Sequence, residues 1–334
     1  MTIDIVFTWV DNSDPIWALK KKEAEKQFSN LLPEANSEAR FMNNDELKYS
    51  LRSIHKFAPW VNNIFIVTDN QIPDWLNTSH PKINVVDHRE IFYDKSYLPT
   101  FSARVIESQI HHIENLSEHF IYFNDDMFLG NTCKPDYFYT QKGFAKIFVS
   151  EIIPIPNKKS FDISRRNIKK RNDHQHAIVN TRKLIHSRFN KSIYYNIRHG
   201  VKPLLKSVLE EVETIFKDDI LKTIRNNFRT ENDILPLHLF SYYAIIKKLG
   251  KPKYLKTVSS KKKFLDGFSS TNKSSTFGYL NLHENNVEQN LNNIKERKPF
   301  IICLNQTPKT PLISIEKIKK FLPEFYPDKS PFEK

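Results

Sequence analysis

The sequence predicts an α/β fold built around a mainly parallel sheet, because short apolar runs alternate with segments of helical periodicity. Four such runs lie in the first half of the chain, and each of them ends close to an aspartate. One aspartate after a strand is usually a turn residue, but the carboxyl ends of parallel strands meet at one edge of a sheet. Four aspartates at that edge therefore predict a polar crevice that binds a cation.

The four strands of the first half are predicted at residues 5–10, 64–68, 83–86 and 120–123. A polar helical segment follows the first strand. The next helix is predicted where Leu47, Leu51 and Ile54 recur on one face, and Pro59 stops it. Ser102 is predicted to cap a third helix, whose apolar stripe consists of Val105, Ile106, Ile110 and Ile113.

The second half is less regular, and its predicted elements are mainly helical. One helix is predicted from Pro203 and another over residues 233–249, entered near Pro236. Residues 259–278 are rich in Ser, Lys and Gly and are predicted to form a loop. The last predicted elements are a strand at 300–304 and a helix at 314–322.

The motif Asn124-Asp125-Asp126 directly follows the fourth predicted strand. Two adjacent carboxylates repel each other, and a proton or a metal ion relieves that repulsion. The motif therefore predicts a Mg²⁺ or Mn²⁺ site for a nucleotide pyrophosphate. An ordinary turn is the alternative, since Asn and Asp are also turn formers.

Positive charge is concentrated in one region of the chain. The net charge is +13, and residues 157–206 hold fourteen Lys and Arg against Asp162 and Asp173. Such a region attracts polyanions, such as a phosphate-bearing polymer, a nucleic acid or an anionic membrane surface. A solvated basic loop is the alternative.

Other features of the composition exclude several classes of site. With six glycines and neither a G-x-G-x-x-G nor a Walker sequence, P-loop chemistry is unsupported. Cys133 and Cys303 are too few for a disulfide framework or a thiolate metal site, and we expect reduced thiols. Neither a signal peptide nor a transmembrane run is expected. We therefore expect a cytoplasmic protein, and a peripheral membrane association through the basic region stays open.

Several segments together resemble the Stealth family of bacterial capsule polysaccharide phosphotransferases. They begin with Asp4-Ile5-Val6-Phe7-Thr8-Trp9-Val10-Asp11 and end with Phe123-Asn124-Asp125-Asp126-Met127. Between them the resemblance covers residues 44–54, 58–61, 64–69, 71–76, 98–102 and 106–108. The same segments are similar to the catalytic part of the animal GlcNAc-1-phosphotransferase.

The resemblance is sparser in the second half. Arg198-His199-Gly200 is similar to a segment that carries a functional histidine, and 228–233 to one that carries a functional arginine. The segment 300–306 is similar to a further family region, which usually ends in Asn-Asp. Here it ends in Asn305-Gln306, so a metal-ligand role for this segment is in doubt.

The resemblance implies a Rossmann-like, GT-A-related nucleotide-sugar-binding α/β domain with helical additions in the C-terminal half. Residues 1–150 would form the nucleotide-sugar-binding core, and 151–334 a basic and helical region that completes the active site of one catalytic domain. The implied reaction moves a hexose-1-phosphate, often an N-acetylhexosamine-1-phosphate, from a UDP-sugar to a hydroxyl of a growing, anionic capsular polysaccharide. UMP would leave, and nucleic acid is not an expected partner.

The expected roles of the site residues follow from this reaction. Asp126 is the first choice as ligand of Mg²⁺ or Mn²⁺ and as a catalytic residue, with Asp125 as the second ligand. Arg229 suits a bidentate phosphate contact. His199 would take the hydroxyl proton or donate to a phosphate oxygen. Candidates for holding the nucleotide or sugar are Asp4, Asp11, Asn12, Asp69 and Asn124, and Asn305 is a further candidate in the site.

Two other functional classes remain open from the sequence. A GT-A-type glycosyltransferase would use the same metal and nucleotide but would release UDP, because the acceptor attacks the anomeric carbon. A non-catalytic polyanion-binding protein would depend on residues 157–206, and its crevice carboxylates would be dispensable.

Overall fold

The computed structural model describes residues 1–28, 31–32, 37–152, 172–193, 195–257 and 276–334. The densest part of the predicted basic region, residues 158–171, lies outside these ranges. The α-helices are α1 (Pro15–Glu25), α2 (Glu46–Phe57), α3 (His88–Ile91), α4 (Ala103–Glu107), α5 (Asp173–Phe189), α6 (Lys206–Ile215), α7 (Lys217–Ile224), α8 (Pro236–Ile246), α9 (Val287–Arg297) and α10 (Leu312–Phe325).

The strands form three sheets. They are β1 (Ile3–Thr8), β2 (Ile64–Thr68), β3 (Ile83–Asp87), β4 (His119–Asn124), β5 (Met127–Leu129), β6 (Ala145–Ile152), β7 (Tyr195–Ile197), β8 (Lys202–Leu205), β9 (Gly250–Tyr254), β10 (Lys256–Thr257), β11 (Thr276–Asn281) and β12 (Ile301–Asn305). Their orders are β3-β2-β1-β4-β8, β10-β11-β12-β5 and β7-β6-β9.

The five-stranded sheet confirms the α/β prediction. Strands β1, β2, β3 and β4 pair in parallel, and β8 adds antiparallel to β4. Ile5, Val6 and Phe7 are all at most 1% exposed, although neighbouring residues of a strand point to opposite faces. Both faces of the sheet are therefore covered, which is typical of parallel sheets.

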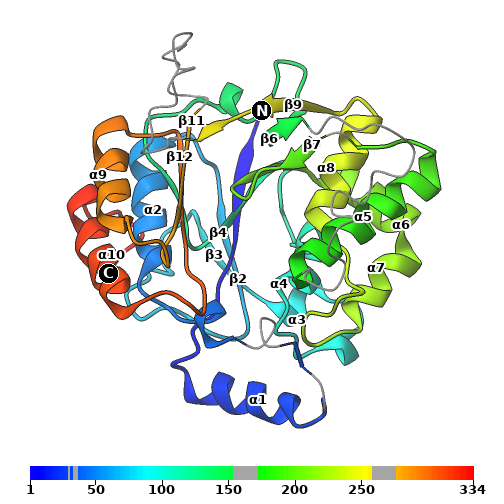
Figure 1. The fold of residues 1–334 in the computed structure, drawn as a ribbon, viewed down its shortest axis with the longest axis horizontal. Coiled ribbons are helices and arrows are strands. Elements are labelled where there is room, and N and C mark those ends of the chain that lie inside the picture. Colours follow the sequence, from blue (N-terminus) through cyan, green and yellow to red (C-terminus); the bar gives the residue numbers. More distant parts are fainter. Residues whose placement is uncertain (29–30, 33–36, 153–171, 194, 258–275) are drawn as a thin grey trace.

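The helices lie on both sides of the strands in two groups, and α9 and α10 pack on the sheet of β11, β12 and β5. Figure 1 shows α2, α9 and α10 together on the left and α4 to α8 on the right, with the strands between them. No helix in the described ranges is long and apolar enough to cross a bilayer. Cys133 and Cys303 are both free and buried, as expected.

The two halves of the chain share their sheets. Strand β8 belongs to the second half but completes the sheet of the first half. Conversely, β5 of the first half pairs antiparallel with β12 near the end of the chain. These exchanges bring residues far apart in sequence to the same edge of the main sheet.

Three predicted elements differ from the structure. The segment after Pro203 begins as strand β8 and becomes helix α6 only at Lys206, because its apolar residues complete the edge of the main sheet. The predicted loop at 259–278 ends too late, since β11 already starts at Thr276; residues 259–275 lie outside the described ranges. The helix after Ser102 is split into α4 and the 3-10 turn η3 (Ile110–His112), and the Ser102 side chain accepts no capping hydrogen bond.

Candidate functional site

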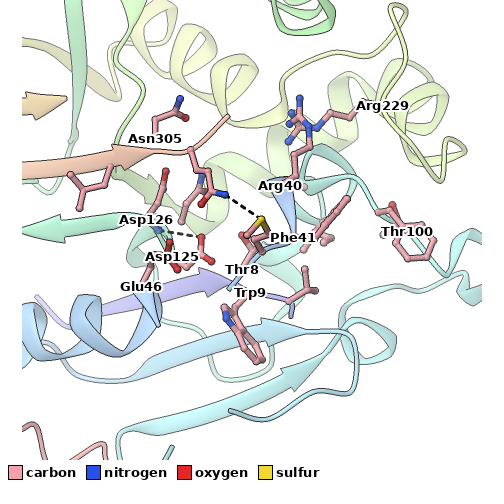
Figure 2. Close-up of a pocket in the computed structure, with 18 of the residues that line it drawn as sticks. Thr8, Trp9, Arg40, Phe41, Glu46, Thr100, Asp125, Asp126, Arg229 and Asn305 are labelled. Atoms are coloured by element: carbon pink, nitrogen blue, oxygen red, sulfur yellow. Dashed lines mark hydrogen bonds between the residues drawn. The ribbon is translucent and has the colours of Figure 1, made fainter. Parts of the chain in front are cut away.

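A cavity of about 250 Å³ lies beyond the carboxyl ends of β1, β4 and β12. This is the place where open α/β sheets bind ligands. The cavity collects six of the residues selected from the sequence, namely Asn124, Asp125, Asp126, His199, Arg229 and Asn305. Figure 2 shows its acidic residues at one end and two arginines at the other.

Three carboxyl groups form the acidic end of the cavity. Asp125 and Asp126 follow β4, and Glu46 is the first residue of α2. Burial and then the Glu46 charge raise the pKa of Asp126 to about 7, and burial followed by Glu46 and Asp126 raises the pKa of Asp125 well above its ordinary value. Burial likewise raises the pKa of Glu46. Three acids in one place therefore need a cation or protons to balance their charge.

The donor atoms at this end suit a hard divalent cation. Asp126 Oδ1 and Asn124 Oδ1 are buried and have no hydrogen-bond partner within the described part of the chain. A buried oxygen without a partner is costly, and coordination would satisfy it. Cys303 Sγ lies 3.6 Å from Asp126 Oδ2, but burial and the Asp126 charge raise the pKa of this thiol well above its usual range. The oxygens of Asp125 and Asp126 therefore fit Mg²⁺ or Mn²⁺ better than the thiol fits a soft metal.

Arginines form the opposite end of the cavity. Arg229 lies in the loop between α7 and α8, and Arg40 ends the 3-10 turn η1 (Glu38–Arg40). Both approach the same carboxylate oxygen, Asp173 Oδ2, at 4.0 Å and 3.9 Å. The two guanidinium groups face the three carboxyl groups across the cavity. A diphosphate bound there would lie between the arginines and a metal-binding site at the acidic end.

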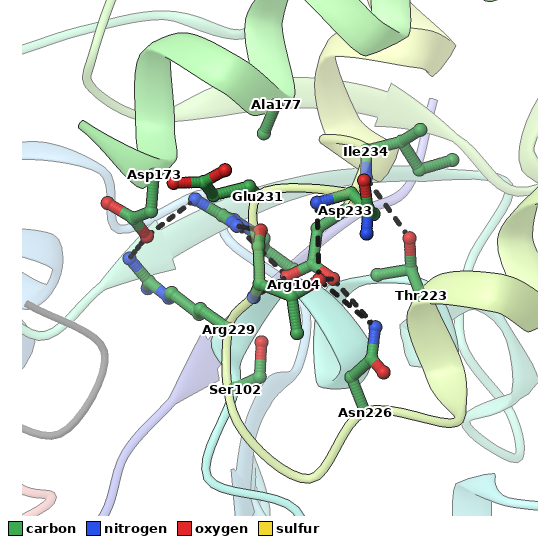
Figure 3. Close-up of polar contacts among 12 residues, drawn as sticks. Ser102, Arg104, Asp173, Ala177, Thr223, Asn226, Arg229, Glu231, Asp233 and Ile234 are labelled. Carbon is green, nitrogen blue, oxygen red and sulfur yellow. Dashed lines mark hydrogen bonds and ion pairs between the residues drawn. The ribbon is translucent and has the colours of Figure 1, made fainter. Parts of the chain in front are cut away.

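A buried ion-pair network holds this arginine end in place (Figure 3). Arg104 on α4 donates from Nη2 to Asp173 Oδ2 at 2.9 Å and from Nη1 to Asp233 Oδ2 at 3.0 Å. The three side chains are at most 2% exposed. Thr230, the neighbour of Arg229, donates from its backbone N–H to Asp233. The network thus fixes the loop that carries Arg229.

His199 stands on the turn between β7 and β8 and faces the cavity. Partial burial, followed by Lys202, His174 and Arg229, lowers the pKa of His199. The imidazole is therefore neutral at pH 7. A neutral imidazole at this place can accept a proton near pH 7.

Four residues predicted at the site lie elsewhere. Asp4 sits near the amino end of β1, is fully buried, and accepts hydrogen bonds from the backbone N–H groups of Asn63 and Ser117. Asp69 forms an ion pair with Lys20 at 2.8 Å. Asp11 lines a second cavity of about 330 Å³, which shares Trp9 with the first. Asn12 lines neither cavity.

Asp4 was a candidate for holding the nucleotide or sugar. It lies at the amino end of its strand, however, and only the carboxyl ends of the strands face the ligand-binding crevice. Its hydrogen bonds show a structural function, in which the carboxylate ties β1 to the loops before β2 and β4. The roles of the six residues that do meet in the cavity stay predictions.

Family models match most of the first half of the chain and part of the second. The model described as Stealth protein CR1, conserved region 1, matches residues 1–29, conserved region 2 matches 40–147, and conserved region 3 matches 198–246. These ranges contain five of the six predicted residues in the cavity, all except Asn305. The chain belongs to the Stealth family.

Curated relatives of this Stealth chain carry phosphotransferase names. It is 37% identical over 99% of its length to exopolysaccharide phosphotransferase SCO2594 of Streptomyces coelicolor, of which it covers 51%. It is 36% identical over 91% of its length to capsular polysaccharide phosphotransferase fcs1 of Haemophilus influenzae, of which it covers 78%. The chain thus spans about half the length of the Streptomyces relative.

Likeness to solved structures is low. The apo-form glycosyltransferase GlyE of Streptococcus pneumoniae TIGR4 has a TM-score of 0.43 at 11% identity, covering 98% of this chain and 60% of that one. A TM-score this low supports no statement about the function of the Stealth chain.

Three charged residues near the cavity of this Stealth chain were not selected from the sequence. Glu46 was interpreted only as part of a helix start, but its side chain faces the two aspartates. Lys202 was counted only as part of the basic region, yet its positive charge acts on Asp126 and opposes the rise of that carboxyl's pKa. Glu107 accepts a hydrogen bond from the buried Tyr122 hydroxyl at 3.2 Å. Local sequence carries no signal for such long-range proximity.

Gln306 departs from the usual family pattern but lies at the site. It lines the cavity, and its Oε1 accepts a hydrogen bond from Asn44 Nδ2 at 3.0 Å. Asn305 donates to Asn281 Oδ1 at 2.9 Å. Both side chains are amides with protein partners, so this segment supplies no carboxylate to a metal.

Proposed function

We propose that the chain transfers a hexose-1-phosphate from a UDP-sugar to a hydroxyl of a growing capsular polysaccharide, with release of UMP. The observation that carries this proposal is the single cavity with acidic residues at one end and Arg229 and Arg40 at the other. The Stealth family membership and the phosphotransferase names of the relatives support it. We infer an N-acetylhexosamine-1-phosphate as the transferred group.

In the proposed site, Asp125 and Asp126 would hold Mg²⁺ or Mn²⁺, and a bound ion would supply positive charge to balance the diphosphate. Asn124, at the end of β4, lies beside them for contact with the nucleotide or sugar. Arg229 donates two parallel N–H bonds to phosphate oxygens, and the Arg104 network holds its loop in position.

In the proposed reaction, His199 accepts the proton of the acceptor hydroxyl. The acceptor hydroxyl oxygen forms a bond to the β-phosphorus, the bond from that phosphorus to the oxygen bridging the two phosphates breaks, and UMP leaves with the bonding pair. The hydroxyl proton moves to the neutral imidazole of His199. The sugar keeps its phosphate and its anomeric configuration, so each transferred unit adds one phosphodiester.

We further propose that residues 1–150 and 151–334 act as one catalytic domain, because the cavity needs side chains from both. The basic segment at 157–206 would attract the anionic acceptor and the inner membrane surface by long-range electrostatics. Raising the salt concentration should then weaken turnover of long anionic acceptors more than turnover of a short uncharged primer.

The deciding experiment incubates the protein with a panel of UDP-sugars, Mg²⁺ and an oligosaccharide primer. Nucleotide chromatography should detect UMP, and phosphorus NMR should detect phosphodiesters in the product. UDP together with a product free of phosphorus would refute the proposal in favour of a glycosyltransferase. Absence of any transfer, with tight binding of anionic polymers, would favour a polyanion-binding protein.

A further inference from the structure

A second group of metal-ligating side chains lies outside the cavity. His111 and His112 end the 3-10 turn η3, and Glu213 stands on α6. The Nε2 atoms of both histidines lie 2.9 Å from the same oxygen, Glu213 Oε2. The potential ligand atoms of the three residues all lie within 4.8 Å of one another. Two imidazoles and one carboxylate thus converge on one point.

The orientation of His112 favours a metal at that point. Its Nδ1 lies 3.0 Å from the backbone oxygen of Ile91, and a carbonyl oxygen only accepts, so Nδ1 must carry the hydrogen. In the neutral ring, Nε2 then has a free lone pair that points at Glu213. Histidines that bind metals adopt this arrangement, because they donate the other ring N–H to a backbone carbonyl or carboxylate.

Hydrogen bonds alone satisfy this geometry only in part. Both Nε2 atoms would need a proton to bind one carboxylate oxygen, and His112 would then be a cation. His111 is 1% exposed, and its Nδ1 has no hydrogen-bond partner in the part of the chain described here.

We propose that His111, His112 and Glu213 bind a zinc ion that ties η3 to α6. Zn²⁺ accepts nitrogen and carboxylate oxygen in tetrahedral geometry, whereas Mg²⁺ requires mainly oxygen ligands. The fourth position falls to water or to the exposed Glu210, which lies three residues before Glu213 on the same face of α6 and whose charge acts on both histidines. The zinc site is therefore distinct in chemistry from the oxygen-lined cavity.

The zinc site would link two segments that lead away from the cavity. Glu107 at the end of α4 is three residues before η3, and β8, which carries Lys202, runs directly into α6. Bound zinc would thus stabilise the folded chain, because it binds the native arrangement and not the unfolded chain.

The test titrates Zn²⁺ alone into metal-free full-length protein, in competition with a chromophoric chelator, and records thermal unfolding. We expect stoichiometric binding and a rise in Tm of several degrees for the wild type. Glu213→Gln keeps the shape of the side chain but removes its charge, and should weaken the affinity roughly 10–100-fold and abolish the rise in Tm. His112→Ala provides a second, independent loss of a ligand.

Two control variants locate the ion. His55→Gln changes an exposed histidine elsewhere and should bind Zn²⁺ like the wild type. Cys303→Ser removes the thiol from Asp126, His199 and Cys303, the other group of potential metal ligands in the described residues, and should also leave zinc binding unchanged. The proposal is overturned if the wild type binds no Zn²⁺, if Glu213→Gln and His112→Ala bind it as tightly as the wild type, or if only Cys303→Ser loses it.

Discussion

Replacing Arg104 by methionine tests whether the buried network supports the arginine end of the site. The substitution keeps the length of the side chain but leaves Asp173 and Asp233 without their shared partner. Removing one member of a buried ion pair destabilises a protein by about 3–5 kcal/mol, because a charge remains buried without compensation.

The structure places Arg104→Met near the lower end of that range. Asp233 keeps three hydrogen bonds, from Thr230 N at 2.9 Å, Thr230 Oγ1 at 2.8 Å and Asn226 Nδ2 at 2.9 Å. Asp173 keeps its longer contacts to the two cavity arginines, at 3.9 Å and 4.0 Å. We therefore expect the free energy of unfolding to fall by about 3 kcal/mol.

Urea unfolding at 25 °C measures this change as a lower midpoint at an unchanged slope. Lys222→Met is the matched control, since its ion pair with Asp219 also measures 3.0 Å but its side chain is 70% exposed. The control should change the free energy of unfolding by less than about 1 kcal/mol.

The double variant Arg104→Met with Asp233→Asn shows whether the two residues act as a pair. We expect it to be more stable than the sum of the single variants implies, by about 1–3 kcal/mol, because no unpaired charge remains at Asp233. A loss below about 1 kcal/mol in Arg104→Met, or strict additivity in the double variant, would refute the reasoning.

Four further outcomes can be measured. Asp126→Asn should slow transfer about 100-fold or more, on the order of 3 kcal/mol, and excess chelator should stop transfer by the wild type. Full turnover in either experiment would rule out a metal-binding site at Asp126. Arg229→Lys loses the planar fork and should lose about 1.5–3 kcal/mol of transition-state stabilisation, measured as kcat/KM. Burial lowers the pKa of His88 to about 4, so the unfolded state takes up a proton at a higher pH than the folded state, and the free energy of unfolding should fall as pH drops from about 6.5 towards 4. In urea unfolding, His88→Gln should reduce this loss by about 3 kcal/mol. Gly130→Ala drives a Cβ into the carbonyl oxygen of Pro299 and should cost about 1–3 kcal/mol of stability, and a wild-type urea midpoint would contradict this.

Local sequence determined the elements whose signals are strong and short-range. The apolar run at 64–68 is strand β2 without a change of boundary, and the helix from Leu47 to Pro59 is α2 within two residues. These predictions succeed because strand and helix periodicities record which side of each element is buried. The same local signal failed after Pro203, where Leu204 and Leu205 fit a helix face or a buried strand equally well.

The sequence also determined the acidic end of the site, but only in part. Asn124-Asp125-Asp126 was recognisable because a strand is followed directly by adjacent carboxylates. Their placement with His199 and Arg229 in one cavity agrees with the expectation from the family resemblance. Asp4 shows the limit of that argument, since it matches the family pattern but its carboxylate holds loops at the amino end of β1.

Only the tertiary structure decided which distant residues meet. Glu46 joins the two aspartates because α2 packs beside β5, and Arg104 reaches both Asp173 and Asp233 because α4 lies between α5 and the loop before α8. His111, His112 and Glu213 converge across 101 residues of sequence in the same way. The chain's local preferences fix the direction of each side chain along its own element, but the contacts between elements arise from packing the whole core, which no short stretch of sequence encodes.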